Sequence, residues 1–189
     1  MRRFPMILAV LLVNSAHAEL DVQQLVEAAK ERTKKIVIYD GGYRKLDYPM
    51  GDVPENIGVC TDVIIRSLRK VGLDLQQAVH EDMRENFALY PANWGLTRPD
   101  SNIDHRRVPN LEVYFSRFAE TLPATRDAEY KAGDIVSWRL KNGLPHIGIL
   151  VDRDSNDGRR PLVVHNIGAG VVMEDVLFEY QLVGHFRLK

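Results

Sequence analysis

The stretch ENIGVCTDVIIRSLRKVG, residues 55–72, contains Cys60, the single cysteine among 189 residues. After this cysteine, apolar side chains recur at the spacing of one helix face: Ile64, Ile65, Leu68 and Val71. Gly72 then ends the segment, as glycine often does at a helix C-terminus. The sequence therefore predicts that Cys60 opens a helix. Because a helix N-terminus offers a positive dipole end and unpaired N–H groups, we expect the pKa of this thiol to be lowered.

The N-terminus has the pattern of a secretory signal peptide. Arg2 and Arg3 precede an apolar run over residues 6–13, and small residues follow at Ala16 and Ala18. That run is shorter than the roughly 20 apolar residues a membrane helix needs, and no later segment reaches this length. We therefore expect residues 1–18 to be removed, which leaves one exported domain, residues 19–189, without an integral membrane segment. In a Gram-negative host this domain would be periplasmic.

An unpaired cysteine is unusual in an exported protein, because structural cysteines in oxidising compartments normally form disulfides. Cys60 is then a reactive group, a partner in an intermolecular disulfide, or a buried thiol without chemistry. The composition, 45% hydrophobic and 27% charged residues, is that of an ordinary globular domain. The net charge of −1 becomes about −3 without Arg2 and Arg3. Such a balance gives no polycationic surface for nucleic acid or anionic lipid.

Helix and strand patterns occupy different parts of the chain. Helical spacing is present in residues 21–35, 60–72, 75–90 and 110–120, and KIVIYD at 35–40 has the pattern of a short strand. From residue 133 onward, short β-rich runs are separated by the turn signals Asn142-Gly143 and Asp157-Gly158. The sequence predicts an α+β fold in which helices pack on a small antiparallel sheet.

A nucleophilic cysteine needs a base, and a histidine oriented by a third polar group is the usual solution. His146 begins the run HIGILVD, and His165 ends the run PLVVH. An antiparallel hairpin would bring both to one end of the sheet, which favours a site of Cys60, His146 and His165. The alternatives are a core histidine at position 146, and a turn residue at position 165 with Asn166 as the orienting group.

Five segments form an ordered set: YDGG at 39–42, CTDVI at 60–64, GDIVSW at 133–138, HIGILV at 146–151 and VVHNIGAGVV at 163–172. In these residues the chain resembles the NlpC-type cell-wall cysteine peptidases, a circularly permuted branch of the papain-like superfamily. With DHRRVPNL at 104–111, it is most similar to the bacterial family catalogued as domain of unknown function 1287.

The resemblance implies a papain-like fold and an amidase that cleaves cell-wall peptides through a thioester, with no cofactor. It implies that Cys60 is the nucleophile, His146 the general base and His165 the residue that orients His146. The backbone N–H of Cys60 would donate to the oxyanion. Tyr39 loosely matches the tyrosine that these enzymes place near the oxyanion hole.

Three departures from the family pattern affect the expected site. Thr61 and Asp62 stand where Ser-Gly is usual, and the Asp62 carboxylate, itself a candidate for substrate or oxyanion support, is expected to oppose thiolate formation. The insertion DRDSNDGRR, residues 152–160, is expected to lengthen the hairpin between the histidines. In the added DHRR loop, Arg106 and Arg107 are either a solvated charge run or a bidentate clamp for a substrate carboxylate.

Metal binding is not expected. Residues 152–158 alternate like a calcium loop, but the glycine falls one position late and Val163 stands where the glutamate should be. Cys60, His146 and His165 lack a fourth ligand for structural zinc. Two other functions remain open: a lipid amidase or acyltransferase that uses the same three residues, and a non-catalytic wall-binding module.

Overall fold

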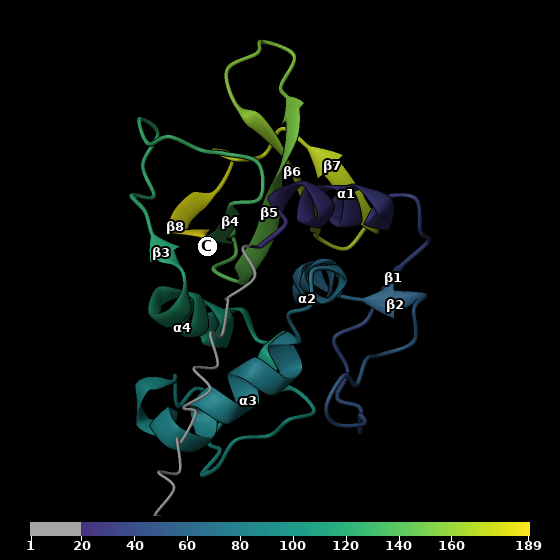
Figure 1. The fold of residues 1–189 in the computed structure, drawn as a ribbon, viewed down its shortest axis with the longest axis vertical. Helices are drawn as coiled ribbons and strands as arrows, with labels where there is room; N and C mark the ends of the chain where they lie inside the picture. Colours follow the sequence, from purple (N-terminus) through teal and green to yellow (C-terminus); the bar gives the residue numbers. More distant parts are fainter. Residues whose placement is uncertain (1–19) are drawn as a thin grey trace, which may run out of the picture.

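The computed structural model describes residues 20–189 and has helices packed against an antiparallel sheet (Figure 1). The helices are α1 (Val22–Arg32), α2 (Cys60–Lys70), α3 (Leu75–Asn86) and α4 (Val108–Phe118), with 3-10 turns η1 (Phe87–Leu89) and η2 (Asp104–Arg106). The strands are β1 (Ile38–Tyr39), β2 (Ile57–Gly58), β3 (Glu120–Thr121), β4 (Ile135–Arg139), β5 (Pro145–Asp154), β6 (Pro161–Asn166), β7 (Val171–Glu174) and β8 (Gln181–Arg187). The expected α+β class is confirmed. The predicted signal peptide lies outside the described residues.

The main sheet has the strand order β3-β8-β4-β5-β6-β7, and all its neighbours are antiparallel. One face packs on the helices through Ile147, Ile149 and Val164. The other face carries a second apolar cluster centred on Trp138, whose indole N–H donates to the Leu177 carbonyl at 3.0 Å. Both faces of the sheet are therefore covered, which holds β5 and β6 rigidly between two cores.

Helix α2 lies at the centre of the molecule, next to α1 and the sheet (Figure 1). All its residues from Cys60 to Leu68 are buried. Full burial of a side chain such as Ile64 or Leu68 contributes about 1.5–3 kcal/mol to stability, so the helix is firmly anchored. The predicted helix that starts at Cys60 is confirmed, and Gly72 follows it with a positive φ of 86°.

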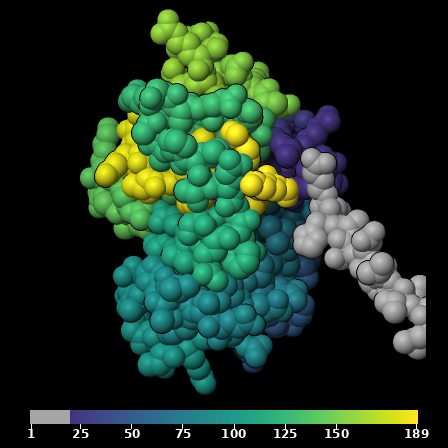
Figure 2. Space-filling model, turned by 60° about the vertical axis from the view of Figure 1, so that its left-hand side comes forward, coloured from purple at the N-terminus to yellow at the C-terminus, as the bar shows by residue number. Residues whose placement is uncertain are grey.

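The β5–β6 hairpin absorbs the insertion at residues 152–160, as expected. Its tip projects beyond the rest of the molecule (light green in Figure 2). Ile149 pairs with Val164 and Leu150 with Val163, so the ends that carry the two histidines stay in register. The insertion therefore extends the hairpin away from the histidines.

Three predicted elements differ from the structure in extent. The strand expected at 35–40 shrinks to Ile38–Tyr39, paired in parallel with β2, because it lies at the surface, where Ile36 is 90% exposed. The third helix ends at Asn86, because Tyr90 turns back to donate its hydroxyl to the buried Asp82 at 2.6 Å. The fourth begins at Val108, two residues early, since a proline fits the first helical turn.

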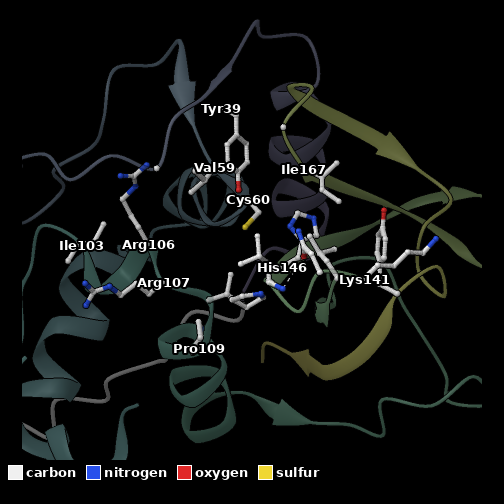
Figure 3. Close-up of a pocket in the computed structure, with 18 of the residues that line it drawn as sticks. Tyr39, Val59, Cys60, Ile103, Arg106, Arg107, Pro109, Lys141, His146 and Ile167 are labelled. Carbon is white, nitrogen blue, oxygen red and sulfur yellow. Dashed lines mark hydrogen bonds between the residues drawn. The ribbon is translucent and has the colours of Figure 1, made fainter. Parts of the chain in front are cut away.

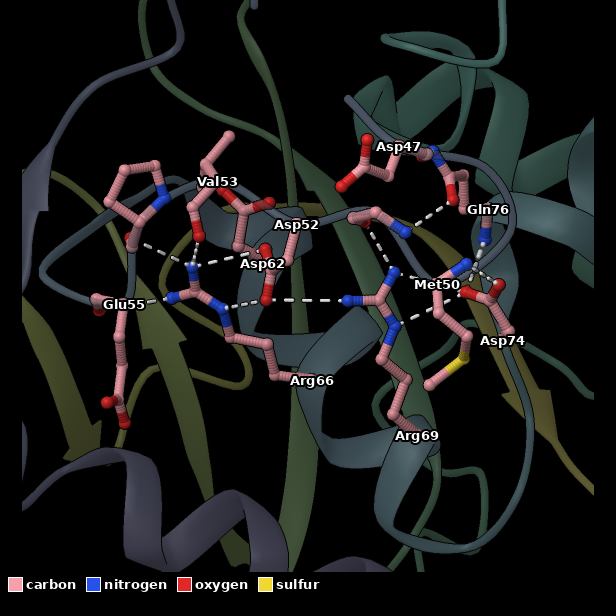
Figure 4. A network of polar contacts seen from close by, with 12 residues as sticks. Asp47, Met50, Asp52, Val53, Glu55, Asp62, Arg66, Arg69, Asp74 and Gln76 are labelled. Atoms are coloured by element: carbon pink, nitrogen blue, oxygen red, sulfur yellow. Dashed lines mark hydrogen bonds and ion pairs between the residues drawn. The ribbon is translucent and has the colours of Figure 1, made fainter. Parts of the chain in front are cut away.

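The loop before β2 is fastened by arginines of α2 (Figure 4). Arg66 donates to both oxygens of Asp52, at 2.9 and 3.2 Å, and to the backbone carbonyls of residues 53–55. Arg69 donates to Asp74 and to the Gly51 carbonyl. The helix that carries Cys60 thus also fixes the chain that leads into it.

Candidate active site

Cys60 is the first residue of α2, and only 5% of its surface is exposed. Val59 precedes it in an extended conformation, and the Asp62 carboxylate accepts the Val59 N–H at 2.6 Å. The backbone N–H groups of Ile147, Thr61 and Cys60 itself are directed at the sulfur. The helix start and β5 therefore surround the thiol with backbone donors.

The structure corrects the expectation that the thiol pKa is lowered. Burial raises the pKa of Cys60 to about 12, because a thiolate here would lose its hydration. The N–H donor of Ile147 lowers this pKa in part, the charge of Asp62 raises it, and the helix N-terminal donors lower it again. Burial raises the thiol pKa by more than the helix N-terminus lowers it, so Cys60 is a protonated thiol at neutral pH.

The two predicted histidines meet across the β5–β6 hairpin. His146 Nε2 lies 2.9 Å from His165 Nδ1, and both residues are almost fully buried. When Nε2 of His146 donates this hydrogen bond, its Nδ1 carries a free lone pair and His165 is protonated at Nε2. His146 also borders the same pocket as Cys60, and in this tautomer its Nδ1 is the nitrogen with the free lone pair, while the Nε2 of His165 is buried without a hydrogen-bond partner within residues 20–189.

Burial also keeps both histidines neutral. It lowers the pKa of His146 to about 3, with a further contribution from His165, and the pKa of His165 to about 4. At neutral pH the site therefore holds a thiol and a neutral imidazole instead of a preformed thiolate–imidazolium pair.

We expect the free energy of unfolding to fall as the pH drops from 6.5 toward 4. His146 and His165 have pKa values of about 3 and about 4 when folded, below the roughly 6.5 of the unfolded chain. Between these values the unfolded state binds more protons, so stability is complete above pH 6.5 and declines below it. Each histidine contributes a slope of about 1.4 kcal/mol per pH unit.

Urea unfolding at a series of pH values from 7.5 to 4.5 measures this slope. His105, also buried and with its pKa lowered to about 4 by burial, adds to it. In the variant His165→Gln, the slope of unfolding free energy against pH is expected to be smaller by the contribution of one histidine, about 1.4 kcal/mol per pH unit. An equal slope in this variant and the wild type would show that His165 does not titrate on unfolding.

Tyr39 and Asn166 lie at different positions around Cys60 and His146. Tyr39, in β1, points its hydroxyl toward the sulfur of Cys60 (Figure 3), and burial together with the Cys60 charge raises its pKa. Asn166 donates to the Gly58 carbonyl at 3.4 Å and accepts the Gly168 N–H at 3.1 Å. It therefore braces the approach to α2, while His165 is the residue that contacts His146.

The DHRR loop is not a solvated charge run, because η2 buries Asp104, His105 and Arg106. Arg106 binds both oxygens of Asp62 at 2.9 Å, so its guanidinium is not free to clamp a substrate carboxylate. The predicted clamp is therefore wrong for Arg106. Arg107 stacks on Trp94 at 4.0 Å, donates through Nη1 to one oxygen of Asp104 at 3.0 Å and borders the pocket.

Cys60 and His146 open into a cavity of about 670 Å³. No aspartate or glutamate is among the residues that line it, and its wall is mainly apolar (Figure 3). Lys141, from the β4–β5 turn, lines the side opposite Arg107 and makes no ion pair within residues 20–189. Sequence reasoning missed Lys141, although the Asn142-Gly143 turn signal just before His146 places it near the site.

No group of three or more metal-ligating side chains suited to a metal ion occurs within residues 20–189. His146 and His165 join two of their ring nitrogens in one hydrogen bond. No helix in the described part of the chain has the length and apolar character to cross a membrane.

Comparison with known proteins identifies the family. The family described as domain of unknown function DUF1287 matches residues 26–188, which is most of the chain. This chain belongs to the DUF1287 family. It is 56% identical over 164 residues to the uncharacterized protein YijF of Escherichia coli (strain K12), covering 86% of this chain and 80% of that protein. The predicted membership of DUF1287 is confirmed. The matched residues include Cys60, His146 and His165.

Proposed function

We propose that this DUF1287 protein is an exported cysteine amidase with an NlpC-type, papain-like fold. The observation that carries the proposal is that the single thiol, at a helix N-terminus, and His146 line one pocket, with His146 hydrogen-bonded to His165 behind it. Export, with periplasmic placement in a Gram-negative host, rests on the signal peptide pattern of residues 1–18. Cell-wall peptides are the substrate that the resemblance suggests.

In the proposed reaction, the Cys60 sulfur attacks the amide carbonyl carbon while its proton passes to Nδ1 of His146. The oxyanion that forms accepts the N–H of Cys60, and the Tyr39 hydroxyl is placed to assist. The C–N bond then breaks as His146 returns the proton to the leaving amine. Water, deprotonated by His146, attacks the thioester, which releases the acid and restores the thiol.

The charge of the pocket supports a substrate that carries carboxylates. Arg107, between η2 and α4, and Lys141, in the β4–β5 turn, line the pocket together with the Asp62-paired Arg106, and no acidic side chain lines it. Stem peptides of the cell wall, including those with diaminopimelate, present such carboxylates. Cations on two sides of the cavity would engage them on either side of the scissile amide.

We expect Lys141→Ala to lower kcat/KM for a carboxylate-bearing peptide about tenfold, mainly through KM, since one charge-assisted contact is worth about 1.5–3 kcal/mol. Steady-state kinetics on soluble cell-wall peptides, with and without amidation of their carboxyl groups, measure this effect. The matched control is Lys45→Ala, because Lys45 is exposed and lies outside the pocket. An equal loss on the amidated peptide would show that Lys141 does not bind a carboxylate.

Digestion of purified sacculi, with mass spectrometry of the released products, tests the proposal. The expected result is release of peptide fragments with new amine and carboxyl ends by the wild type and not by Cys60→Ala. Equal digestion by both forms would overturn the nucleophile assignment. Sacculus binding by both forms without turnover by either would instead indicate a wall-binding module.

The apolar wall of the cavity favours one second candidate, an amidase or acyltransferase acting on acyl chains. Val59, Val108, Leu144 and Ile167 line it, and Leu144 is 58% exposed. The same three residues would cleave an acyl amide or ester by the same steps. Release or transfer of fatty acyl groups from lipid substrates, with no peptide products from sacculi, would support this candidate over the first.

A further inference from the structure

We infer that the buried ion pair between Asp62 and Arg106 positions the Cys60 nucleophile, an inference that rests on the proposed function. Arg106 Nε and Nη2 each lie 2.9 Å from a different oxygen of Asp62, and the two side chains are 2% and 3% exposed. A bidentate pair in a dry environment fixes direction as well as distance. Asp62, expected from the sequence only to oppose thiolate formation or to support the substrate, is therefore held in one orientation by Arg106.

The Asp62 end of the pair sets the start of α2. Its Oδ2 accepts the Val59 N–H at 2.6 Å, which fixes the residue before the nucleophile. The carboxylate lies so close to the backbone that a Cβ on Gly58 would come within 3.1 Å of Oδ2. This hydrogen bond and the helix that Asp62 belongs to fix the backbone on both sides of Cys60.

The Arg106 end holds the segment that follows Tyr39. Nη2 donates to the Asp40 carbonyl at 3.2 Å and Nη1 to the Gly42 carbonyl at 3.4 Å. Asp40 and Gly42 are the neighbours of Gly41 in the segment that follows Tyr39. Tyr39 and Gly41 both line the pocket. The Thr61 hydroxyl also donates to the Arg106 carbonyl at 3.1 Å.

One guanidinium thus joins three segments that are distant in sequence: the Tyr39 segment, the N-terminus of α2 and η2. Tyr39 and the Cys60 N–H, the two groups proposed to meet the oxyanion, lie on two of these segments. Their separation is therefore set through Arg106 and Asp62, which act as positioning residues. Arg106 borders the pocket, but its side chain is 2% exposed and its guanidinium is held by Asp62 and the two carbonyls. A lysine at position 106 would keep the charge but lose the fork that makes these contacts together.

The chain offers a matched control in the pair between Asp82 and Arg117. Arg117 also binds one carboxylate through Nε and Nη2, each at 2.9 Å, and Asp82 is buried. This pair joins α3 to α4, and neither residue lines the cavity. Arg117 is more exposed than Arg106, at 30% of its side chain, but its partner is 6% exposed, so a change at Arg117 perturbs a bidentate pair on a buried carboxylate without reaching the nucleophile.

The experiment compares Asp62→Asn, Arg106→Lys and the control Arg117→Lys in the mature protein. It measures kcat and KM on soluble cell-wall peptides, the rate of iodoacetamide alkylation of Cys60 at pH 8, and the Tm of each variant. We expect kcat to fall at least tenfold in Asp62→Asn and Arg106→Lys with KM within twofold of the wild type. In Asp62→Asn alkylation becomes several-fold faster, because a charge that opposes the thiolate is removed.

Two results would overturn the inference: kcat within twofold of the wild type in both variants, or an equal loss of kcat in Arg117→Lys at an equal drop in Tm. Because a loss of stability also exposes a buried thiol, faster alkylation supports the inference only when the Tm of the variant falls no further than that of Arg117→Lys. If the wild type itself turns over no cell-wall peptide, the proposed function fails, and alkylation alone decides the inference. Alkylation rates that differ several-fold from the wild type in Asp62→Asn and Arg106→Lys, but not in Arg117→Lys, then support it, and unchanged rates in both refute it.

Discussion

Cys60→Ala is expected to reduce amide hydrolysis by on the order of 10⁴-fold or more, because removal of a covalent nucleophile leaves only binding and oxyanion contacts. The change removes a single buried sulfur at a helix start, and alanine is a good helix former, so the fold should persist. Initial rates of amine release from soluble cell-wall peptides measure the effect.

The control for this prediction is the free energy of unfolding of the Cys60→Ala variant, measured in urea at pH 7.5. It should stay within about 2 kcal/mol of the wild type, within the range common for single substitutions. A stable variant with undiminished hydrolysis would contradict a thiol mechanism. A variant that has lost both stability and activity calls for Cys60→Ser, which retains the shape of the site and is still expected to lose most activity.

His146→Gly is expected to lower kcat by about 10³-fold, within the 10²–10⁴-fold that a general base contributes. The loss should be large because burial raises the pKa of Cys60 to about 12, so the sulfur depends on this base to lose its proton. Added imidazole should restore part of kcat by entering the space left at the pocket. Rates with increasing imidazole, in His146→Gly and the wild type, measure the rescue.

The neighbouring histidine is expected to matter less. His165→Phe keeps an aromatic ring but removes the hydrogen-bond acceptor for His146 Nε2, so we expect a loss of about 10–100-fold without imidazole rescue. His80→Ala is the control, because His80 is outside the pocket. Equal losses in all three variants would indicate general destabilisation and not a base with an orienting partner.

The start of α2 and the meeting of the histidines could be predicted because both depend on local pattern. The periodic apolar residues after Cys60 fix the helix, and the hairpin brings His146 and His165 together whatever the length of its tip. The sequence alone also indicated DUF1287 membership, which the family comparison confirms.

The charge state of the site could not be predicted from the same pattern. A helix N-terminus lowers a thiol pKa, but the packing of α2 against β5 buries Cys60, and burial is a property of the whole fold. The ion pair between Arg106 and Asp62 could not be predicted either, because the two residues are 44 positions apart in the sequence. Such long-range pairs leave no periodic trace in the sequence.

The most direct test of the central claim is detection of the thioester on Cys60. The mature protein is mixed with a soluble cell-wall peptide, quenched in acid within milliseconds to seconds, and analysed by intact and peptide-level mass spectrometry. The account predicts a transient mass increase equal to the acyl part of the substrate, located on the peptide that contains Cys60 and absent from Cys60→Ala. Steady release of cleaved product with no adduct at any time point, and with the Cys60→Ala variant equally active, would contradict it.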